Sequence, residues 1–384
     1  MGVSEGYVYR GNDIPISWNG FEARAWVPEP LAAQAFDVGP QAIRLTERAA
    51  AAAVAASHRT SVLGPLATLL LRSEGVASSS IEGLHAPVAD VAAAEVGGAN
   101  SDVAVHVADN LGAVVGAIAA PERALSQKDI MAWHRRLTGS GGALPPRMVG
   151  RYRTEQSWVG GTSPQDAAFV PPPAALVGDL MADLVSFAND TSLDPVTQAA
   201  VIHAQFESIH PFADGNGRIG RVLIGWVLAH RLELRVPPPV SVLIARDRGG
   251  YLAGLALFRM GQLDPWVEWV ARALQRSSEA AGDLAARAEV LFDDWRVRTS
   301  EVRTDAAARR LLELLPEHPV LTAAWVAERL GVSSRSGQYA LSELAARGIV
   351  ERYRPRRPGR GRPSQYWVAQ ELIDLVSAWS AGTS

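Results

Sequence analysis

The stretch HPFADGNGRIGR, from His210 to Arg221, brings one histidine, one carboxylate, a Gly-Asn-Gly turn and two arginines together in twelve residues. Glycine adopts positive φ angles readily and lets phosphate oxygens approach the backbone closely. A turn of this kind before a helix points successive N–H groups into one concavity, which is typical of an anion site. We therefore expect Gly215, Asn216 and Gly217 to surround phosphate groups.

The charged residues of this stretch suit a nucleotide with several phosphates. Arg218 and Arg221 lie three positions apart on the first turn of the expected helix, so both guanidinium groups reach the same side. Asp214 offers a hard oxygen ligand for Mg²⁺, and His210 is the expected base for a hydroxyl that attacks the phosphate chain. Alone, a Gly-x-Gly turn or a histidine at a helix end is more often a packing or capping feature, but the combination favours catalysis.

The composition of the chain excludes several other kinds of chemistry. The sequence has 384 residues, a net charge of −3 and no cysteine, so disulfides, Cys-ligated metals and thiol catalysis are excluded. At this length two or three domains are expected. The sequence shows no apolar run of about 18 residues, and its start lacks the basic and apolar regions of a secretion signal. We therefore expect a cytoplasmic protein without a membrane segment.

Most of the chain around the motif has the periodicity of helices. The segment 195–209 predicts a buried helix that ends at His210, and the first hundred residues are expected to be mostly helical. Two short β-prone segments between Ser157 and Val170 are separated by Gly, Ser, Pro and Asp, which predicts a hairpin. The apolar stripe of the 195–209 helix consists of Ala199, Ile202, Phe206 and Ile209.

The last eighty residues follow a different pattern. Three short helices are expected over 309–319, 321–331 and 333–348, followed by two β-prone segments that flank a basic turn. The stretch RYRPRRPGRGRP, residues 352–363, has six arginines in twelve positions. This order predicts a winged helix-turn-helix, in which a basic wing and a recognition helix would contact DNA. A protein-interaction or dimerisation role for the same module is the alternative.

The quoted motif resembles the signature of Fic-domain proteins, His-x-Phe-x-(Asp/Glu)-Gly-Asn-Gly-Arg-x-x-Arg, at every specified position. The resemblance covers about residues 20–275 and includes WVPEPL, GRYR, WVGG and FVPPP before the motif and RDRGGYLAGL after it. It implies a mainly helical Fic-type domain with a short β-hairpin flap, which the winged helix then follows. The matching residues are His210, Phe212, Asp214, Gly215, Asn216, Gly217, Arg218 and Arg221.

The resemblance also implies an activity, the transfer of AMP from ATP to a hydroxyl side chain of a protein with release of pyrophosphate. His210 would deprotonate the hydroxyl, Asp214 would hold Mg²⁺ on the α- and β-phosphates, and Phe212 would anchor the loop. The flap would bind the target protein by strand addition, so that one side chain faces His210. A surface hairpin without a partner is the alternative for the flap.

Other residues of the motif would hold the nucleotide. The turn would cradle the phosphates, with Asn216 orienting the α-phosphate, while Arg218 and Arg221 would hold the β- and γ-phosphates. In relatives that phosphorylate their targets a lysine replaces the second glycine, so Gly217 favours AMP transfer. Tyr251 matches a position that lines the nucleotide pocket in relatives, although packing alone is the alternative.

A second pattern of the family, (Ser/Thr)-x-x-x-Glu-(Gly/Asn), fits SSSIEG with Ser78, Glu82 and Gly83 at the specified places. In relatives this helix lies against the nucleotide site, and its glutamate pairs with the second arginine. Glu82 would therefore bind Arg221 and keep ATP out of a productive γ-phosphate pose. A solvated glutamate at a helix end is the alternative.

These patterns divide the chain into residues 1–110 with the inhibitory motif, 111–275 as the catalytic domain, 276–304 as a connecting helix and 305–384 as the winged helix domain. The alternative function is a DNA-binding regulator that senses nucleotide without significant AMP transfer. His210 favours the enzyme, because a sensor needs no base. The sequence does not identify the target, the modified residue, the DNA site or other donors, and a homodimer is only a family expectation.

Overall fold

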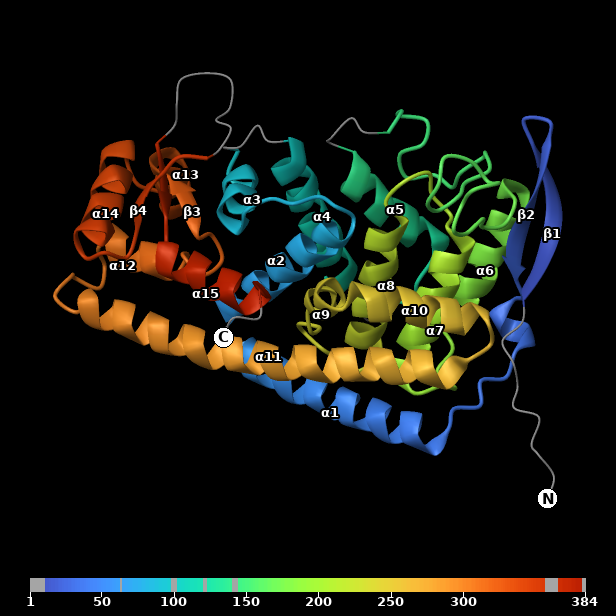
Figure 1. Ribbon diagram of the computed structural model, residues 1–384. Helices are drawn as coiled ribbons and strands as arrows, with labels where there is room; N and C mark the ends of the chain where they lie inside the picture. Colours follow the sequence, from blue (N-terminus) through green and yellow to red (C-terminus); the bar gives the residue numbers. More distant parts are fainter. Residues whose placement is uncertain are drawn as a thin grey trace.

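The computed structural model describes residues 11–62, 64–97, 102–119, 123–139, 144–355 and 365–381. This part of the chain is mainly helical, with one two-stranded and one three-stranded antiparallel sheet (Figure 1). A larger group of helices surrounds α7 (Pro195–Ile209) and α8 (Asn216–Arg231), and a smaller group forms the C-terminal end (Figure 1). None of the helices in these ranges is long and apolar enough to cross a membrane.

The described chain opens with a β-hairpin of β1 (Gly11–Trp18) and β2 (Phe21–Pro28), which the expectation of a mostly helical first hundred residues did not include. Its turn consists of Asn19 and Gly20, with φ angles of 50° and 83°. Asn-Gly is a strong signal for a two-residue hairpin turn because both positions need positive φ. The signal was therefore present in the sequence and was overlooked.

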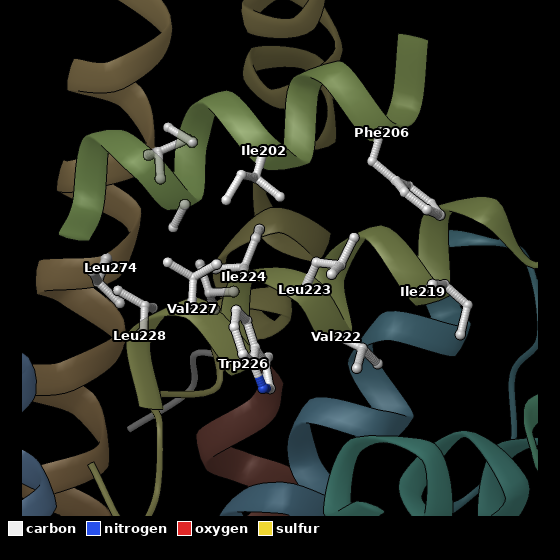
Figure 2. Packing of buried hydrophobic residues seen from close by; sticks show 14 of the residues in the cluster. Ile202, Phe206, Ile219, Val222, Leu223, Ile224, Trp226, Val227, Leu228 and Leu274 are labelled. Carbon is white, nitrogen blue, oxygen red and sulfur yellow. The ribbon is translucent and has the colours of Figure 1, made fainter. Parts of the chain in front are cut away.

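The core of the larger group forms where α7 and α8 pack against each other. Ile202 and Phe206 point from α7 toward α8, and Leu223 points from α8 toward α7, while Ile219 belongs to the same buried cluster (Figure 2). All four side chains are fully buried, as the apolar stripe of the 195–209 segment predicts for Ile202 and Phe206. This contact fixes the end of α7 against the start of α8, and the quoted motif lies between these two ends.

Further helices enclose this pair. The longest, α11 (Leu263–Arg298), has 36 residues and runs alongside α1 (Pro40–Val62) before it reaches the C-terminal group (Figure 1). The expected boundary at residue 275 lies inside this uninterrupted helix. The other elements are η1 (Leu31–Ala33), α2 (Gly64–Ile81), α3 (Val88–Glu95), α4 (Asp102–Ile118), α5 (Gln127–Thr138), η2 (Ala174–Leu176), α6 (Val177–Ala188), α9 (Val240–Arg246) and α10 (Arg248–Arg259).

The C-terminal group is a winged helix. Its helices are α12 (Ala307–Leu312), α13 (Ala323–Leu330), α14 (Ser334–Ala346) and α15 (Gln370–Ala381), and its strands are β3 (Val320–Thr322), β4 (Glu351–Tyr353) and β5 (Tyr366–Val368). The strand order β3-β5-β4 adds one strand to the expected two-stranded ribbon. β3 joins the sheet because its buried Val320 and Leu321 pair with Val368 and Trp367. Residues 356–364 of the expected wing lie outside the described residues.

Helix α2 belongs to both groups. Leu69 packs in the core of the winged helix, whereas Leu70, Ala77 and Ile81 pack in the core around α7 and α8. The C-terminal helix α15 also contacts α2 (Figure 1). The helix that carries the inhibitory pattern is therefore held by the winged helix as well as by the larger group.

Candidate active site

The end of α7 places His210 next to the motif loop. The helix starts under the Asp194 carboxylate, which accepts hydrogen bonds from the Val196 and Thr197 N–H groups. It ends at His210, whose left-handed backbone has a φ of 50°, and Pro211 follows. A proline cannot continue the helical hydrogen bonding, so the chain leaves the helix at this point.

Arg153 fixes the backbone of His210. Its buried guanidinium donates through Nε to the His210 carbonyl at 2.9 Å and through Nη1 to the Glu155 carbonyl at 3.0 Å. A third donation goes to the Pro172 carbonyl. One side chain thus ties the end of α7 to the segment on both sides of the flap. The GRYR segment in which it lies was noted in the sequence only as part of the family resemblance.

The imidazole of His210 is neutral near pH 7. Burial, together with the positive charge of Arg153, lowers its pKa from 6.5 to about 4. Its Nδ1 atom is buried without a well-formed hydrogen bond in the described part of the chain, and the backbone of Glu207 acts in the opposite direction by raising the pKa. A neutral imidazole is the form that a general base requires.

The motif loop is held by two side chains that point inward. The Asn216 amide accepts from the Phe212 N–H and donates to the Phe212 carbonyl, both at 2.8 Å. Phe212 is fully buried, as its expected anchoring place requires. The side chain of Asn216 is therefore used to close the turn, so a contact with the α-phosphate is left to its backbone N–H.

His134, on α5, supports the same loop. Its ring stacks on Phe212 with 3.9 Å between centroids, and its Nε2 donates to the Asp214 carbonyl at 3.0 Å. Its Nδ1 accepts from the Gly150 N–H at 2.9 Å, which fixes the neutral Nε2–H tautomer. Burial lowers its pKa from 6.5 to about 4. No pattern in the sequence indicates this role, because it depends on a contact between distant segments.

The start of α8 has the geometry of a helix N-terminus, while its role as an anion site stays a prediction. Gly215 precedes the helix with a φ of 82°, and the Ile219 N–H is the first to bond back to its carbonyl, at 3.1 Å. The N–H groups before Ile219 are therefore free of the helical ladder, as at any helix start. The buried Arg218 donates to Asp214 at 3.0 Å, and 55% of the Asp214 side chain is exposed.

Glu82 and Arg221 form the expected ion pair. The Glu82 Oε1 accepts from the Arg221 Nη2 at 2.8 Å. The buried Arg221 also donates to the Ser78 hydroxyl at 2.9 Å and to its carbonyl at 2.8 Å. A Cβ atom at position 217 would lie 2.1 Å from the Glu82 Oε1, so Gly217 leaves the room that this carboxylate occupies. The carboxylate therefore lies over the start of α8, where phosphates would bind.

Two other ionisable residues lie under Arg221. Tyr251 is buried, and its hydroxyl forms a 2.9 Å hydrogen bond with the His203 Nε2, so the Tyr251 side chain faces the core. The role of Tyr251 in nucleotide binding stays a prediction. Glu207, three residues before His210, has a buried Oε1 without a partner among the described residues. Burial raises the pKa of Glu207 to about 7. Sequence reasoning missed this carboxyl because only its burial distinguishes it.

The flap is shorter than the sequence predicts. Val159 and Phe169 form one antiparallel bridge, with N–H to carbonyl distances of 2.8 and 3.2 Å. Gly160 and Gly161 follow with φ angles of 71° and 68°, and these left-handed residues interrupt a regular ladder. The hairpin thus consists of a single paired position in the described chain.

Comparison with known proteins agrees with this geometry. Residues 124–228 match the Fic/DOC family, and residues 304–361 match the MarR family. A Fic family protein from Desulfovibrio desulfuricans G20 has a similar fold, with a TM-score of 0.54 and 24% identity over 87% of this chain and 97% of that one. The chain therefore contains a Fic domain and, at its C-terminal end, a MarR-type winged helix.

Curated relatives share only part of their length with this chain. It is 34% identical over 151 residues to Protein adenylyltransferase fic-1 of Caenorhabditis elegans, which is 38% of this chain and 27% of the relative. It is 30% identical over 169 residues to Protein adenylyltransferase Fic of Drosophila willistoni, which is 43% of this chain and 32% of the relative. The chain thus spans about a third or less of these relatives.

Proposed function

We propose that this chain is a protein adenylyltransferase, which transfers AMP from ATP to a hydroxyl side chain of a protein, and that Glu82 inhibits it. The observation that carries the proposal is the neutral imidazole of His210 beside the anion site at the start of α8. The names of the relatives support the same reaction. The cytoplasmic location and the homodimer stay predictions.

In this reaction the residues of the chain position groups and move one proton. His210 accepts the proton of the target hydroxyl as its oxygen attacks the α-phosphorus and pyrophosphate leaves. The N–H groups at the start of α8 and the guanidinium of Arg218 stabilise the charge on the phosphate oxygens. Arg153, His134 and Asn216 hold the loop rigid, so these donors are in place before the substrates arrive.

Asp214 fits a magnesium ion that ATP would carry to the site. Its carboxylate is the acidic group of the motif loop and is more than half exposed, whereas Phe212, Gly215 and Asn216 of the same loop are buried. Mg²⁺ is commonly held by phosphates with one or two protein carboxylates, so a single Asp is sufficient. When bound, the ion would neutralise charge on the phosphate chain.

Inhibition follows from the position of Glu82. Its carboxylate neutralises Arg221, which is the expected partner of the γ-phosphate, and it brings a negative charge to the start of α8. Two anions cannot share this place at low energy. We infer that ATP binds productively only when the end of α2 moves away or loses this carboxylate.

Labelled ATP tests both parts of the proposal. We expect Glu82→Gly to raise incorporation of label from [α-³²P]ATP with Mg²⁺ by about 5- to 150-fold, the usual range of a coupling between sites. His210→Ala in the same background should lower incorporation by about 10²- to 10⁴-fold. Glu233→Gly is the matched control, because Glu233 already has a positive φ of 52° and lies at the far end of α8.

One result would favour a nucleotide sensor instead. If purified Glu82→Gly protein binds ATP but transfers no label to itself or to proteins of a cell lysate, the enzyme proposal is wrong. Binding without transfer would then be the function of the Fic domain, and the His210→Ala variant would behave like its parent.

We also propose that the winged helix contacts DNA. Helix α14 starts under the Ser333 side chain, and it exposes Arg335 and Tyr339, which form a 3.1 Å hydrogen bond with each other. A labelled duplex should bind with an affinity that falls steeply as salt rises. Arg335→Ala should weaken this binding, whereas Arg303→Ala, on the link between α11 and α12, should not. Binding that is insensitive to salt and to Arg335→Ala would contradict the proposal.

A further inference from the structure

A groove of about 520 Å³ lies next to the catalytic loop. Its walls are formed by the segment from Arg147 to Trp158, and Ala213 of the motif closes one side. Ala213 stands between Phe212 and Asp214, so the groove opens beside the loop that carries the reacting groups. The groove lies apart from the Arg221 site, which Glu82 covers.

The exposed charge of this groove is mainly positive. Arg147 and Arg151 are exposed, and their side chains form no ion pair or hydrogen bond with any residue that the structure describes. A second hollow of about 720 Å³ shares Arg151 with the groove and adds Arg135, which is also exposed and unpaired among the described residues. Glu155 is the acidic residue of the lining. The two hollows together present three free guanidinium groups and one carboxylate.

The free edge of the flap faces the same groove. The Trp26 N–H donates to the Val170 carbonyl at 2.9 Å, so β2 covers the side of the flap that follows Phe169. Val159 turns its own N–H and carbonyl toward Phe169. Neighbours along a strand point these groups to the opposite side, so the free edge is formed by Trp158 and Gly160.

Trp158 connects the free edge with the basic surface. Trp158 lines the groove, and its ring packs edge to face against Trp18 of the N-terminal hairpin, with 5.4 Å between the ring centroids. The backbone of Trp158 and Gly160 has no hydrogen bond within the described ranges. A peptide that pairs with this edge therefore continues directly into the groove with the free arginines.

We propose that this groove binds an acidic segment of the target protein, close to the hydroxyl that receives AMP. The inference rests on the proposed function and adds the chemical class of the substrate. Carboxylates of the target pair with Arg147 and Arg151, while its backbone adds to the flap at Trp158 and Gly160. Strand addition alone reads little sequence, so the arginines supply the selectivity that the flap lacks.

Two peptides test the proposal in the full-length Glu82→Gly background. Each carries one threonine in a β-prone core, and its flanks are aspartate and glutamate in one peptide and lysine in the other. Binding is measured by fluorescence anisotropy of the labelled peptides, and transfer by [α-³²P]ATP. We expect the acidic peptide to bind at least about fivefold more tightly at low salt, with the difference shrinking as salt rises.

Charge reversal distinguishes peptide binding in the groove from a general attraction between the peptide and the charge of the whole protein. Arg147→Glu with Arg151→Glu should remove or invert the preference between the peptides, while the affinity for a non-hydrolysable ATP analogue stays the same. Arg44→Glu, on the exposed face of α1, is the control that changes net charge far from the groove. Unchanged ATP affinity shows that the reversed protein is folded.

The outcomes are distinguishable. Equal binding of both peptides, or a preference that survives Arg147→Glu and Arg151→Glu, overturns the acidic-target proposal even if transfer is fast. If no label is transferred at all, the proposed function is wrong, and the anisotropy still decides whether the groove selects acidic peptides.

Discussion

Helix α2 is held more firmly at its middle than at the end that leads to Glu82. At its middle, Arg72 is 0% exposed, donates twice to Glu95 at 2.9 and 2.6 Å and once to the Glu317 carbonyl of the winged helix at 2.9 Å. Directly after its last residue, Glu82 is 38% exposed and makes one ion pair with Arg221. The middle is thus a buried anchor with several partners, and the end is a single contact at the edge of solvent.

This difference suits a helix that inhibits reversibly. Breaking a buried pair leaves an uncompensated charge in the interior, whereas a partly exposed carboxylate is solvated as soon as it leaves its partner. The Glu82 end can therefore release Arg221 while the middle of the helix at Arg72 stays fixed. Between them, Glu74 accepts a 2.8 Å hydrogen bond from the Ser241 N–H of α9, which limits movement to the last turns of the helix.

The largest expected effect comes from the anchor at the middle of α2. Arg72→Met should lower the free energy of unfolding by about 3–5 kcal/mol, since it leaves the Glu95 carboxylate and the Glu317 carbonyl without their donor. Urea unfolding followed by circular dichroism measures it, with the exposed Arg44→Met as the matched control. A loss below that of the Glu82 variants would show that the anchor is no firmer than the inhibitory contact.

An intermediate effect is expected where the winged helix meets α3. The Tyr353 hydroxyl of β4 donates to the Asp90 Oδ1 at 2.6 Å, and α3 follows Glu82 along the chain. Tyr353→Phe should cost about 1–3 kcal/mol, because Asp90 is buried. If the winged helix helps to hold Glu82 in place, Tyr353→Phe should raise label transfer when Glu82 is present and should not raise it in the Glu82→Gly background. A rise in both backgrounds would mean that Tyr353 acts elsewhere.

A small effect on stability is expected at the inhibitory end. Glu82→Gln should change the free energy of unfolding by about 1 kcal/mol or less, since the carboxylate is partly exposed and Ser78 keeps its two hydrogen bonds with Arg221. The measurement is the same urea titration. A loss as large as that of Arg72→Met would remove the contrast between the middle of α2 and its end.

The site was predictable where a residue type is required locally. Gly215 has the positive φ that its place before α8 demands, and the pair of Glu82 with Arg221 was implied by the family resemblance of two short patterns. His134 and Glu207 were not predictable in the same way. Their roles come from burial against segments far away in the sequence. A histidine or glutamate on a helical face does not indicate such burial by its residue type or position.

The fold shows the same limit. Periodicity predicted α7 and the order of elements in the winged helix, because both depend on local pattern. The hairpin of β1 and β2 had a local signal, Asn19 and Gly20, that was overlooked. The third strand β3 had none, since its three residues are a strand only through pairing with β5.

The smallest expected effect is that of pH on the released enzyme. The pKa of His210 is lowered to about 4, so the imidazole stays neutral, and able to act as a base, until the pH falls through that value. In Glu82→Gly with saturating Mg²⁺, kcat/KM should change less than about twofold between pH 7 and 5.5, where a histidine of ordinary pKa would lose about eightfold. Glu207 titrates in this window because burial raises its pKa to about 7. The pH profile of kcat/KM is therefore also measured in the double variant Glu82→Gly with Glu207→Gln. If kcat/KM of that variant still falls as the pH drops below about 6.5, burial does not hold the His210 imidazole neutral.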